Sequence, residues 1–223
     1  MISPTRRVPA AKQPRAAALS NSSKLLDLLS AIELRDRRVA RAVFGLSWKQ
    51  LDEDAAPATP ERLRVLVHML EALELTGDES VLDIGTGAGY RAALLGKLAG
   101  RVLSIEQSPT VAAAARGLLE RMGIQNVEIV VGDGSLGWRT AAPYDAILMG
   151  CASPDVPHQL IDQLTEGGRL VIPVGGNQGQ LIERLRRRSV AVESSTVAPC
   201  SVRPLAFRGE RRSSVPWVEV PGS

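Results

Sequence analysis

Residues 81–90 read VLDIGTGAGY, and the fold of this chain can be predicted from them. Residues 80–84 are a short apolar run that predicts a buried strand, and the Ala- and Leu-rich residues 91–98 predict a helix. A glycine-rich turn between a strand and a helix lets a ligand approach the backbone closely, although many kinds of nucleotide can use such a turn. The candidate binding residues of this turn are Gly85, Thr86, Gly87 and Gly89.

The alternation of strand and helix continues downstream of the turn. Predicted strands lie at 101–105, 127–131, 146–149 and 169–173, and predicted helices at 109–122 and 157–164. Strands separated by such helices pair in parallel through crossover connections. We therefore expect an α/β fold, a Rossmann-like, doubly wound and mostly parallel sheet with helices on both faces. Three further predicted strands would extend one edge antiparallel near the C-terminus, at 181–187, 189–199 and 202–207.

Upstream of the turn the sequence predicts helices. Residues 24–44 carry apolar side chains at roughly helical spacing. Thr59 stands before Pro60 and Glu61, which is the pattern of an N-cap followed by proline at the first helical position. A helix is therefore predicted over residues 60–73.

Length and composition favour a single globular domain. A chain of 223 residues, 44% hydrophobic and 23% charged, can bury one sizeable core. Residues 1–20 are rich in Pro, Ala and Arg and predict a disordered leader. One domain is expected over 21–223, with N-terminal helices over 21–75 and the Rossmann-like core and C-terminal strands over 76–223.

Composition also excludes several classes of function. Aromatic residues make up only 3% of the chain, and its basic excess lies towards the two ends, so no nucleic-acid partner is predicted. The basic N-terminus lacks an apolar stretch, which argues against a signal peptide or membrane span. The chain has two cysteines and two histidines, and none of them has the spacing of metal ligands, so no metal site is expected; they are Cys151, Cys200, His68 and His158. Two cysteines do not make a secreted disulfide framework, so we expect a cytoplasmic protein. We also expect a monomer.

Two acidic residues at successive strand ends narrow the choice of ligand. Glu106 ends the second predicted strand, 17 positions after Gly89, where a carboxylate can accept hydrogen bonds from both hydroxyls of a ribose. Asp133 follows the third strand in GDG and can accept a hydrogen bond from the exocyclic amine of an adenine. Either acid alone is better explained as a solvated strand end. Together with the glycines they predict an adenosyl ligand.

A dinucleotide-dependent enzyme is the rival class. Such enzymes prefer GxGxxG, whose third glycine allows close packing of the helix. Here Gly89 is followed by Tyr90 and Arg91, and no second nucleotide-binding half is apparent. The pattern therefore disfavours this class.

Several motifs, in order and spacing, resemble the protein-L-isoaspartate O-methyltransferase family. They are VLDIGTGAGYRAALLGKL, RVLSIEQSP, NVEIVVGDGSLGW, APYDAILMGCASPDVPHQLIDQLTEGGRLVIPVGGNQGQ and SVRPLAF, which together reach from Val81 to about Phe207. The resemblance implies methyl transfer from S-adenosylmethionine to a carboxylate of a protein or peptide. It also implies that the cofactor site is lined by Asp83, Gly85, Gly87, Glu106, Asp133 and Gly134.

One stretch departs from the family pattern. The family has a loop of the form Gly-Gln-Thr-Ile-Ser-Gln-Pro before its glycine motif, and its Ser helps to hold the substrate carboxylate. Here the stretch reads DEDAAPATPERL, in which Thr59 is the only hydroxyl and the candidate catalytic residue. Its role as a helix cap is the preferred interpretation, because Pro60 and Glu61 after it explain it fully. Three hypotheses stay open: isoaspartyl methylation, methylation of another peptide or small-molecule acceptor, and an inactive cofactor-binding relative.

Overall fold

The computed structural model describes residues 32, 34–46, 59–176, 178–204 and 218–219. The expected leader, the first part of the helical stretch 24–44 and most of the divergent loop lie outside these residues. The helices are α2 (Arg37–Phe44), α3 (Pro60–Ala72), α4 (Tyr90–Leu98), α5 (Pro109–Arg121) and α6 (His158–Ile161), with two short 3₁₀ turns, η2 (Gly134–Leu136) and η3 (Arg139–Ala141). The strands are β1 (Ser80–Ile84), β2 (Arg101–Glu106), β3 (Val127–Val131), β4 (Tyr144–Met149), β5 (Leu164–Gly176), β6 (Gly179–Arg187), β7 (Val192–Cys200) and β8 (Val218–Glu219).

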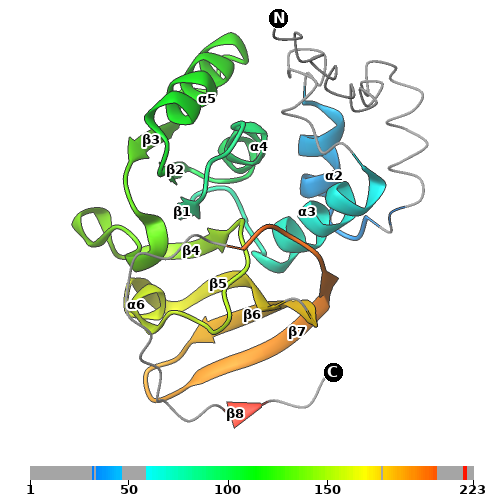
Figure 1. Cartoon of the computed structure of the whole chain (residues 1–223), viewed down its shortest axis with the longest axis vertical. Helices are drawn as coiled ribbons and strands as arrows, with labels where there is room; N and C mark the ends of the chain where they lie inside the picture. Colours follow the sequence, from blue (N-terminus) through cyan, green and yellow to red (C-terminus); the bar gives the residue numbers. More distant parts are fainter. Residues whose placement is uncertain (1–31, 33, 47–58, 177, 205–217, 220–223) are drawn as a thin grey trace, which may run out of the picture.

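The strands form one sheet in the order β3-β2-β1-β4-β5-β6-β7-β8 (Figure 1). The first five pair in parallel, whereas β5, β6 and β7 pair antiparallel. The chain moves outwards from β1 to β3 and then returns to β4 on the other side of β1, so the strand order reverses between β1 and β4. The predicted doubly wound sheet with antiparallel additions at one edge is confirmed. Ligands of open α/β sheets bind at this reversal, beyond the carboxyl ends of the strands.

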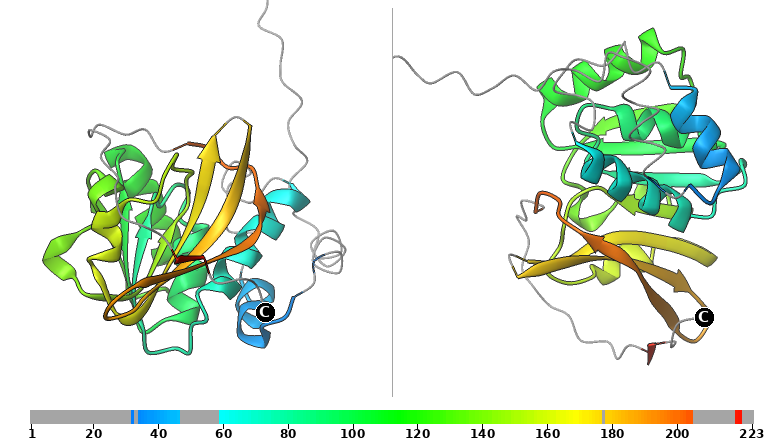
Figure 2. Two further views of the ribbon diagram at one scale, coloured as in Figure 1. Left: turned by 90° about the horizontal axis from the view of Figure 1, so that it is seen from below. Right: turned by 90° about the vertical axis from the view of Figure 1, so that its right-hand side faces the viewer.

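Two apolar layers cover the faces of the sheet. Alternate side chains of each strand point to opposite faces, so Val81 and Leu82 belong to different buried clusters. One cluster takes in α2, α3, α4 and α5, and the other takes in α6. Helices on both faces are confirmed, although among the described residues the second face carries only the short α6 and the 3₁₀ turns. Figure 2 shows β5, β6 and β7, in yellow to orange, at the end of the molecule away from α5.

Several predicted elements differ from those in the structure. The helix expected over 157–164 is only His158–Ile161, because β5 already pairs with β4 from Leu164. The strand expected from 189 begins at Val192, after a turn in which Arg188 N donates to Ala191 O. The strand expected over 202–207 is wrong for its described part. Residues 201–203 have no regular structure, and Pro204 makes one isolated bridge, to Ala152, because this segment crosses the end of β4 instead of continuing the antiparallel sheet.

A carboxylate clamp fixes the amino end of β1. The Glu79 carboxylate accepts hydrogen bonds from Thr76 N, Thr76 Oγ1 and Gly77 N, each at 2.8 Å. Arg169 lies 3.7 Å from it, and its Nε donates to Leu73 O at 2.7 Å. The clamp ties the end of α3 and the following turn to β1 and β5. The glycine turn at the other end of β1 is thereby set on a rigid strand.

The remaining sequence expectations concern membrane and metal. No helix within the described ranges is long and apolar enough to cross a membrane. In the same part of the chain, no group of three or more His, Cys, Asp or Glu side chains is arranged to hold a metal ion.

Candidate cofactor site

The glycine turn after β1 requires backbone conformations that L side chains rarely adopt. Gly85, Gly87 and Gly89 have φ angles of 85°, 55° and 91°. A Cβ on Gly87 would meet only Gly85 O, at 3.9 Å, so this residue faces open space. A Cβ on Gly89 would lie 3.1 Å from the Ala115 Cβ. Gly87 therefore leaves room for a ligand, whereas Gly89 lets α4 pack closely on α5.

Glu106 at the end of β2 holds the turn in place. Its Oε2 accepts a hydrogen bond from Gly87 N at 2.9 Å, and its Oε1 accepts one from Ser108 N at 3.0 Å. A carboxylate has about four lone-pair sites, so both oxygens keep capacity for ligand hydroxyls. Glu106 is also half-buried beside the turn, where the predicted ribose contact would fall.

Asp133 lies just after the end of β3, the strand that pairs with β2. It is exposed, and its Oδ1 accepts a hydrogen bond from Ser135 N at 2.9 Å. Gly134 is buried, and a Cβ there would lie 2.7 Å from Ile84 Cγ2. Asp133 is thus free to face a ligand, while Gly134 allows the loop to pack on the end of β1.

Gln163 holds the loop that follows Asp133, and sequence reasoning missed it. Its Oε1 accepts a hydrogen bond from Trp138 N at 2.7 Å, and its Nε2 donates to Leu136 O at 2.8 Å. A Cβ on Gly137, whose φ is 72°, would lie 2.5 Å from that Oε1. The last glycine of GDGSLG, Gly137, was the available signal in the sequence, because a glycine can mark a position where another part of the chain packs closely.

Asp83 takes part in a buried network beneath the turn. Its Oδ1 accepts a hydrogen bond from Arg91 Nε at 2.7 Å, and its Oδ2 accepts one from Ser104 Oγ at 2.6 Å. The Ser104 hydroxyl also lies 2.5 Å from Thr86 Oγ1. Asp83 and Thr86, both predicted to bind cofactor, are therefore occupied in joining β1, β2 and the turn to α4. Sequence reasoning did not assign Arg91 or Ser104 to this network.

The Arg91 guanidinium covers the junction of β1 and β4. Its Nη2 donates to Ile84 O at 3.2 Å and to Gly85 O. It also lies against Gly150, where a Cβ would come within 1.7 Å of Nη1. The next residue is Cys151, and burial raises the pKa of its thiol to about 11 although the Arg91 charge opposes this. The thiol is therefore neutral near pH 7.

Thr59 lies at the start of α3. It is exposed and caps the helix by accepting a hydrogen bond from Arg62 N at 3.3 Å. Burial raises the pKa of the Tyr90 hydroxyl, and the charges of Arg91 and Arg62 oppose that rise. Arg62 is thus close enough to act on the first residue of α4. The predicted N-cap is confirmed, and the start of α3 borders the site.

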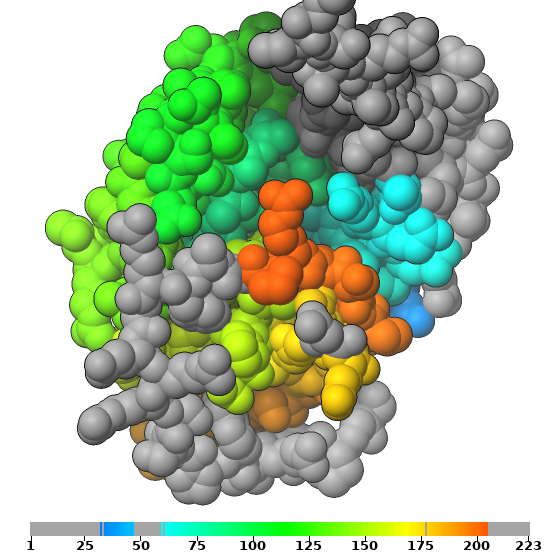
Figure 3. Space-filling view, in the orientation of Figure 1, coloured from blue at the N-terminus to red at the C-terminus, as the bar shows by residue number. Residues whose placement is uncertain are grey.

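The segment that ends at Pro204 borders the site from another direction. Ala152 N, just after β4, donates to Arg203 O at 3.0 Å. Figure 3 shows the orange residues leading to Pro204 beside the cyan start of α3, and α3 packs against β7. The part of SVRPLAF that the structure describes therefore lies across the end of β4.

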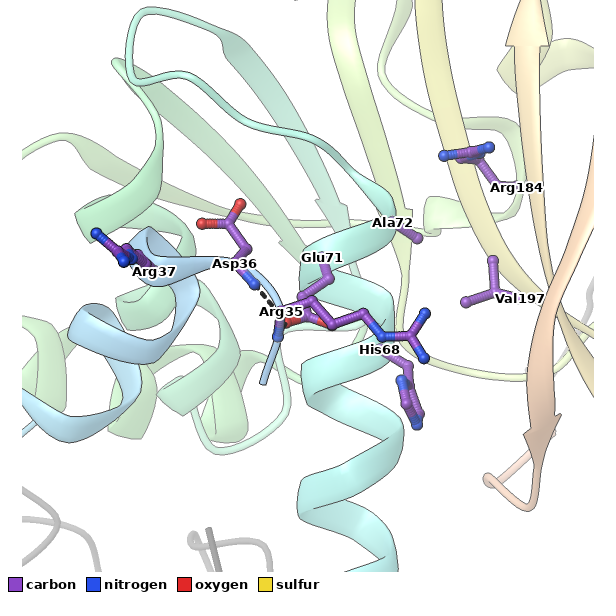
Figure 4. A pocket seen from close by; sticks show the side chains of 8 residues that line it. All are labelled: Arg35, Asp36, Arg37, His68, Glu71, Ala72, Arg184 and Val197. Atoms are coloured by element: carbon purple, nitrogen blue, oxygen red, sulfur yellow. Dashed lines mark hydrogen bonds between the residues drawn. The ribbon is translucent and has the colours of Figure 1, made fainter. Parts of the chain in front are cut away.

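A separate hollow of about 640 Å³ lies between α3 and the strands β6 and β7 (Figure 4). Arg35 N and Asp36 N donate to the Glu71 carboxylate in its wall, at 2.7 and 2.9 Å. None of the predicted cofactor-binding residues lines it; its walls are Arg35, Asp36, Arg37, His68, Glu71, Ala72, Arg184 and Val197.

The sheet order, the glycine turn and the two carboxylates at neighbouring strand ends define a Rossmann-like fold of the methyltransferase class. The chain belongs to the protein-L-isoaspartate(D-aspartate) O-methyltransferase family, whose model matches residues 16–208. The resemblance predicted from the sequence motifs is confirmed.

Two relatives illustrate the match. A protein-L-isoaspartate O-methyltransferase of Myxococcus xanthus is 44% identical over 176 residues, which are 72% of this chain and 83% of the relative. One of Anaeromyxobacter dehalogenans is 41% identical over 201 residues, which are 82% of this chain and 96% of the relative. Both matches extend over most of the two chains, so the likeness concerns the whole domain.

Solved structures agree on the fold. A protein-L-isoaspartate O-methyltransferase superposes with a TM-score of 0.73 at 22% identity, over 84% of this chain and 66% of the other. A Plasmodium falciparum protein in complex with S-adenosyl-L-homocysteine superposes with a TM-score of 0.65 at 16% identity, over 82% of this chain and 97% of the other.

Proposed function

We propose that this chain transfers the methyl group of S-adenosylmethionine to the free carboxylate of an isoaspartyl residue in a protein or peptide. The observation that carries the proposal is the family match over residues 16–208, which includes the whole site. The cofactor of this family is S-adenosylmethionine, and it supplies a methyl group on a positively charged sulfur. This chain's own residues have to bind it, align it and admit the acceptor.

The residues present fit an adenosyl cofactor laid along the carboxyl ends of β3, β2 and β1. Asp133 would accept from the adenine amine and Glu106 from the ribose hydroxyls, because both acids keep unused lone pairs. The open face of Gly87 would let the cofactor approach the backbone. The sulfur end would then lie over β1, next to the junction with β4.

No side chain is needed to activate the acceptor. An aspartyl-type carboxylate has an ordinary pKa of about 3.9, so it is ionised at neutral pH and can attack the methyl carbon directly. The rate then depends on holding oxygen, carbon and sulfur in line. The neutral Cys151 thiol has no step to perform in this scheme.

Thr59 is the residue that we propose to hold the acceptor. It is exposed at the start of α3, where its hydroxyl accepts from Arg62 N and hydrogen-bonds the Glu61 carboxylate, so it would donate to an acceptor carboxylate by turning away from Glu61. The second candidate function, methylation of a different carboxylate, rests on the same residue. The stretch DEDAAPATPERL offers this hydroxyl alone where the family has its loop serine.

Calorimetry with S-adenosylhomocysteine, followed by methyl transfer to an isoaspartyl peptide, tests the proposal. The same peptide with ordinary aspartate is the matched control acceptor. We expect binding and turnover on the isoaspartyl peptide alone. Binding without turnover on either peptide would favour another acceptor, and absence of binding would leave the chain as an inactive relative.

We further propose a monomeric cytoplasmic protein. Cys151 and Cys200 are both free thiols, which fits a reducing compartment. Light scattering of the purified chain at micromolar concentration tests the monomer, and a mass near twice the 23.8 kDa of one chain would contradict it.

A further inference from the structure

Arg91 places a buried positive charge at the point where the sheet reverses its strand order. Its side chain is 12% exposed, and its Nε forms an ion pair with the fully buried Asp83 on β1. Its guanidinium lies against Gly150, which directly follows β4. Only glycine at 150 leaves room for it, since a Cβ would overlap Nη1. The charge is thus held between the ends of the two central strands.

The hydrogen bonds of this guanidinium leave one end unused. An arginine has five N–H groups in a fixed fork. Nε donates to Asp83, and Nη2 donates to Ile84 O and Gly85 O. Within the described part of the chain, Nη1 has no hydrogen-bond acceptor, and it is not among the fully buried unsatisfied atoms. Two N–H groups therefore remain for a ligand.

The position of Nη1 selects the ligand chemistry. In the proposed function, the adenine and the ribose of the cofactor lie over β3 and β2. The groups that reach β1 and β4 are then the amino-acid part of the cofactor and the acceptor. Both carry a carboxylate, which is the group that a guanidinium binds best. The neighbouring Cys151 thiol is neutral and does not compete for the charge.

We propose that Nη1 of Arg91 binds a carboxylate in the complex with cofactor and acceptor. This inference rests on the proposed function and adds a carboxylate-binding residue to its site. The carboxylate comes either from the methionyl part of S-adenosylmethionine or from the acceptor peptide. Arg91 at the same time holds the glycine turn through the Ile84 and Gly85 carbonyls.

The test compares Arg91→Met with wild type and with Arg169→Met. Arg169 is the matched control, because it is also a buried arginine near a carboxylate and bonded to backbone carbonyls, but it lies at the amino end of β1. Calorimetry measures the affinity for S-adenosylhomocysteine and for 5′-methylthioadenosine, which lacks the amino-acid carboxylate. Turnover of an isoaspartyl peptide gives kcat and KM.

Two results support the proposal and identify the source of the carboxylate. If it is the cofactor's, Arg91→Met weakens S-adenosylhomocysteine binding about tenfold or more and leaves 5′-methylthioadenosine within about twofold. If it is the acceptor's, both affinities stay within about twofold and KM for the peptide rises about tenfold or more. Arg169→Met leaves all three constants unchanged.

Removal of Arg91 leaves the Asp83 charge buried without its partner, so folding needs its own control. The same measurements are therefore made on Asp83→Asn with and without Arg91→Met, where that charge is absent. If Arg91→Met changes none of the constants by more than about twofold in either background, Arg91 is a structural residue and the inference is wrong. If the wild type itself neither binds S-adenosylhomocysteine nor turns over the peptide, the proposed function fails as well.

Discussion

The two ends of strand β1 carry the same chemistry and use it differently. At the amino end Glu79 lies near Arg169, and at the carboxyl end Asp83 pairs with Arg91. Glu79 accepts three hydrogen bonds from its own turn, and Arg169 donates to the carbonyls that end α3. Asp83 and Arg91 instead hold a turn whose Gly87 faces open space. A buried carboxylate–arginine pair therefore does not by itself indicate a ligand site. It does so only at the carboxyl ends of the strands, where open α/β sheets bind their ligands.

The largest expected difference between the two ends concerns Gly87→Val. The new side chain would enter the space that Gly87 leaves open, so S-adenosylhomocysteine binding is expected to fall below detection by calorimetry. A side chain in the left-handed region costs roughly 1–2 kcal/mol of stability. Gly123→Val is the matched control, because Gly123 has a φ of 67° and open space for a Cβ in the turn after α5. Equal loss of binding in both variants would mean that strain alone explains the effect.

At the amino end we expect an effect on stability alone. Burial tends to raise the pKa of Glu79, but hydrogen bonds from Gly77 and Thr76 outweigh it and lower the pKa from 4.5 to about 2. A carboxyl whose pKa is depressed on folding stabilises the protein above its unfolded pKa, and this stabilisation is lost as the pH falls through the folded value. The contribution, on the order of 3 kcal/mol, should therefore disappear between about pH 4.5 and pH 2.

Glu79→Gln tests this expectation by urea unfolding at several pH values. The variant should be less stable than wild type at pH 7 by up to about 3 kcal/mol, and the two curves should converge near pH 2. Its affinity for S-adenosylhomocysteine should match that of wild type. A marked loss of affinity would show that the two ends of β1 are coupled.

Glu106→Ala should weaken cofactor binding without much loss of stability. It removes the proposed acceptor for ribose hydroxyls and the bond that fixes Gly87 N, and loss of a hydrogen bond to a charged group costs roughly 1.5–3 kcal/mol. Calorimetry with S-adenosylhomocysteine measures the change. Glu128→Ala, at an exposed position on β3, is the control and should bind as wild type does. Unchanged affinity of Glu106→Ala would leave this acid as a structural residue of the turn.

The smallest expected effect concerns Thr59, at the start of α3. Thr59→Val removes the cap of α3 and should cost about 1 kcal/mol of stability. If the hydroxyl also holds the acceptor, methyl transfer falls while cofactor affinity stays. Asp36→Ala, which removes the cap of α2, is the control for lost stability.

Thr59→Asp separates the two roles of this residue. The carboxylate can still cap the helix, and its charge is favourable at a helix N-terminus. It would however repel an incoming carboxylate. A stable variant with low turnover is expected, and wild-type turnover would leave Thr59 as a cap alone.

The parallel core of this protein was predictable from its amino-acid sequence. Strand β1 and helix α3 follow from an apolar run and from the Thr-Pro-Glu start, and both have the predicted position. The glycine turn was also predictable from a local pattern, because alternating glycines indicate left-handed backbone conformations. The neighbouring positions of Glu106 and Asp133 were predictable because the ends of parallel strands meet at one edge, and their contact with the cofactor stays a prediction. All these signals are local, and the family motifs added the reaction.

The contacts between side chains around the glycine turn and the loop after Asp133 could not be predicted from the sequence. Asp83 and Arg91 are eight positions apart, but Ser104 and Gly150 reach them from other strands. Gln163 reaches the loop after Asp133 from just before β5. The segment at Pro204 crosses the end of β4 instead of forming a strand, through one bridge to Ala152. Such contacts join residues far apart in sequence, so neither hydrophobic periodicity nor secondary-structure propensity predicts them. They depend on how the sheet brings its strand ends together.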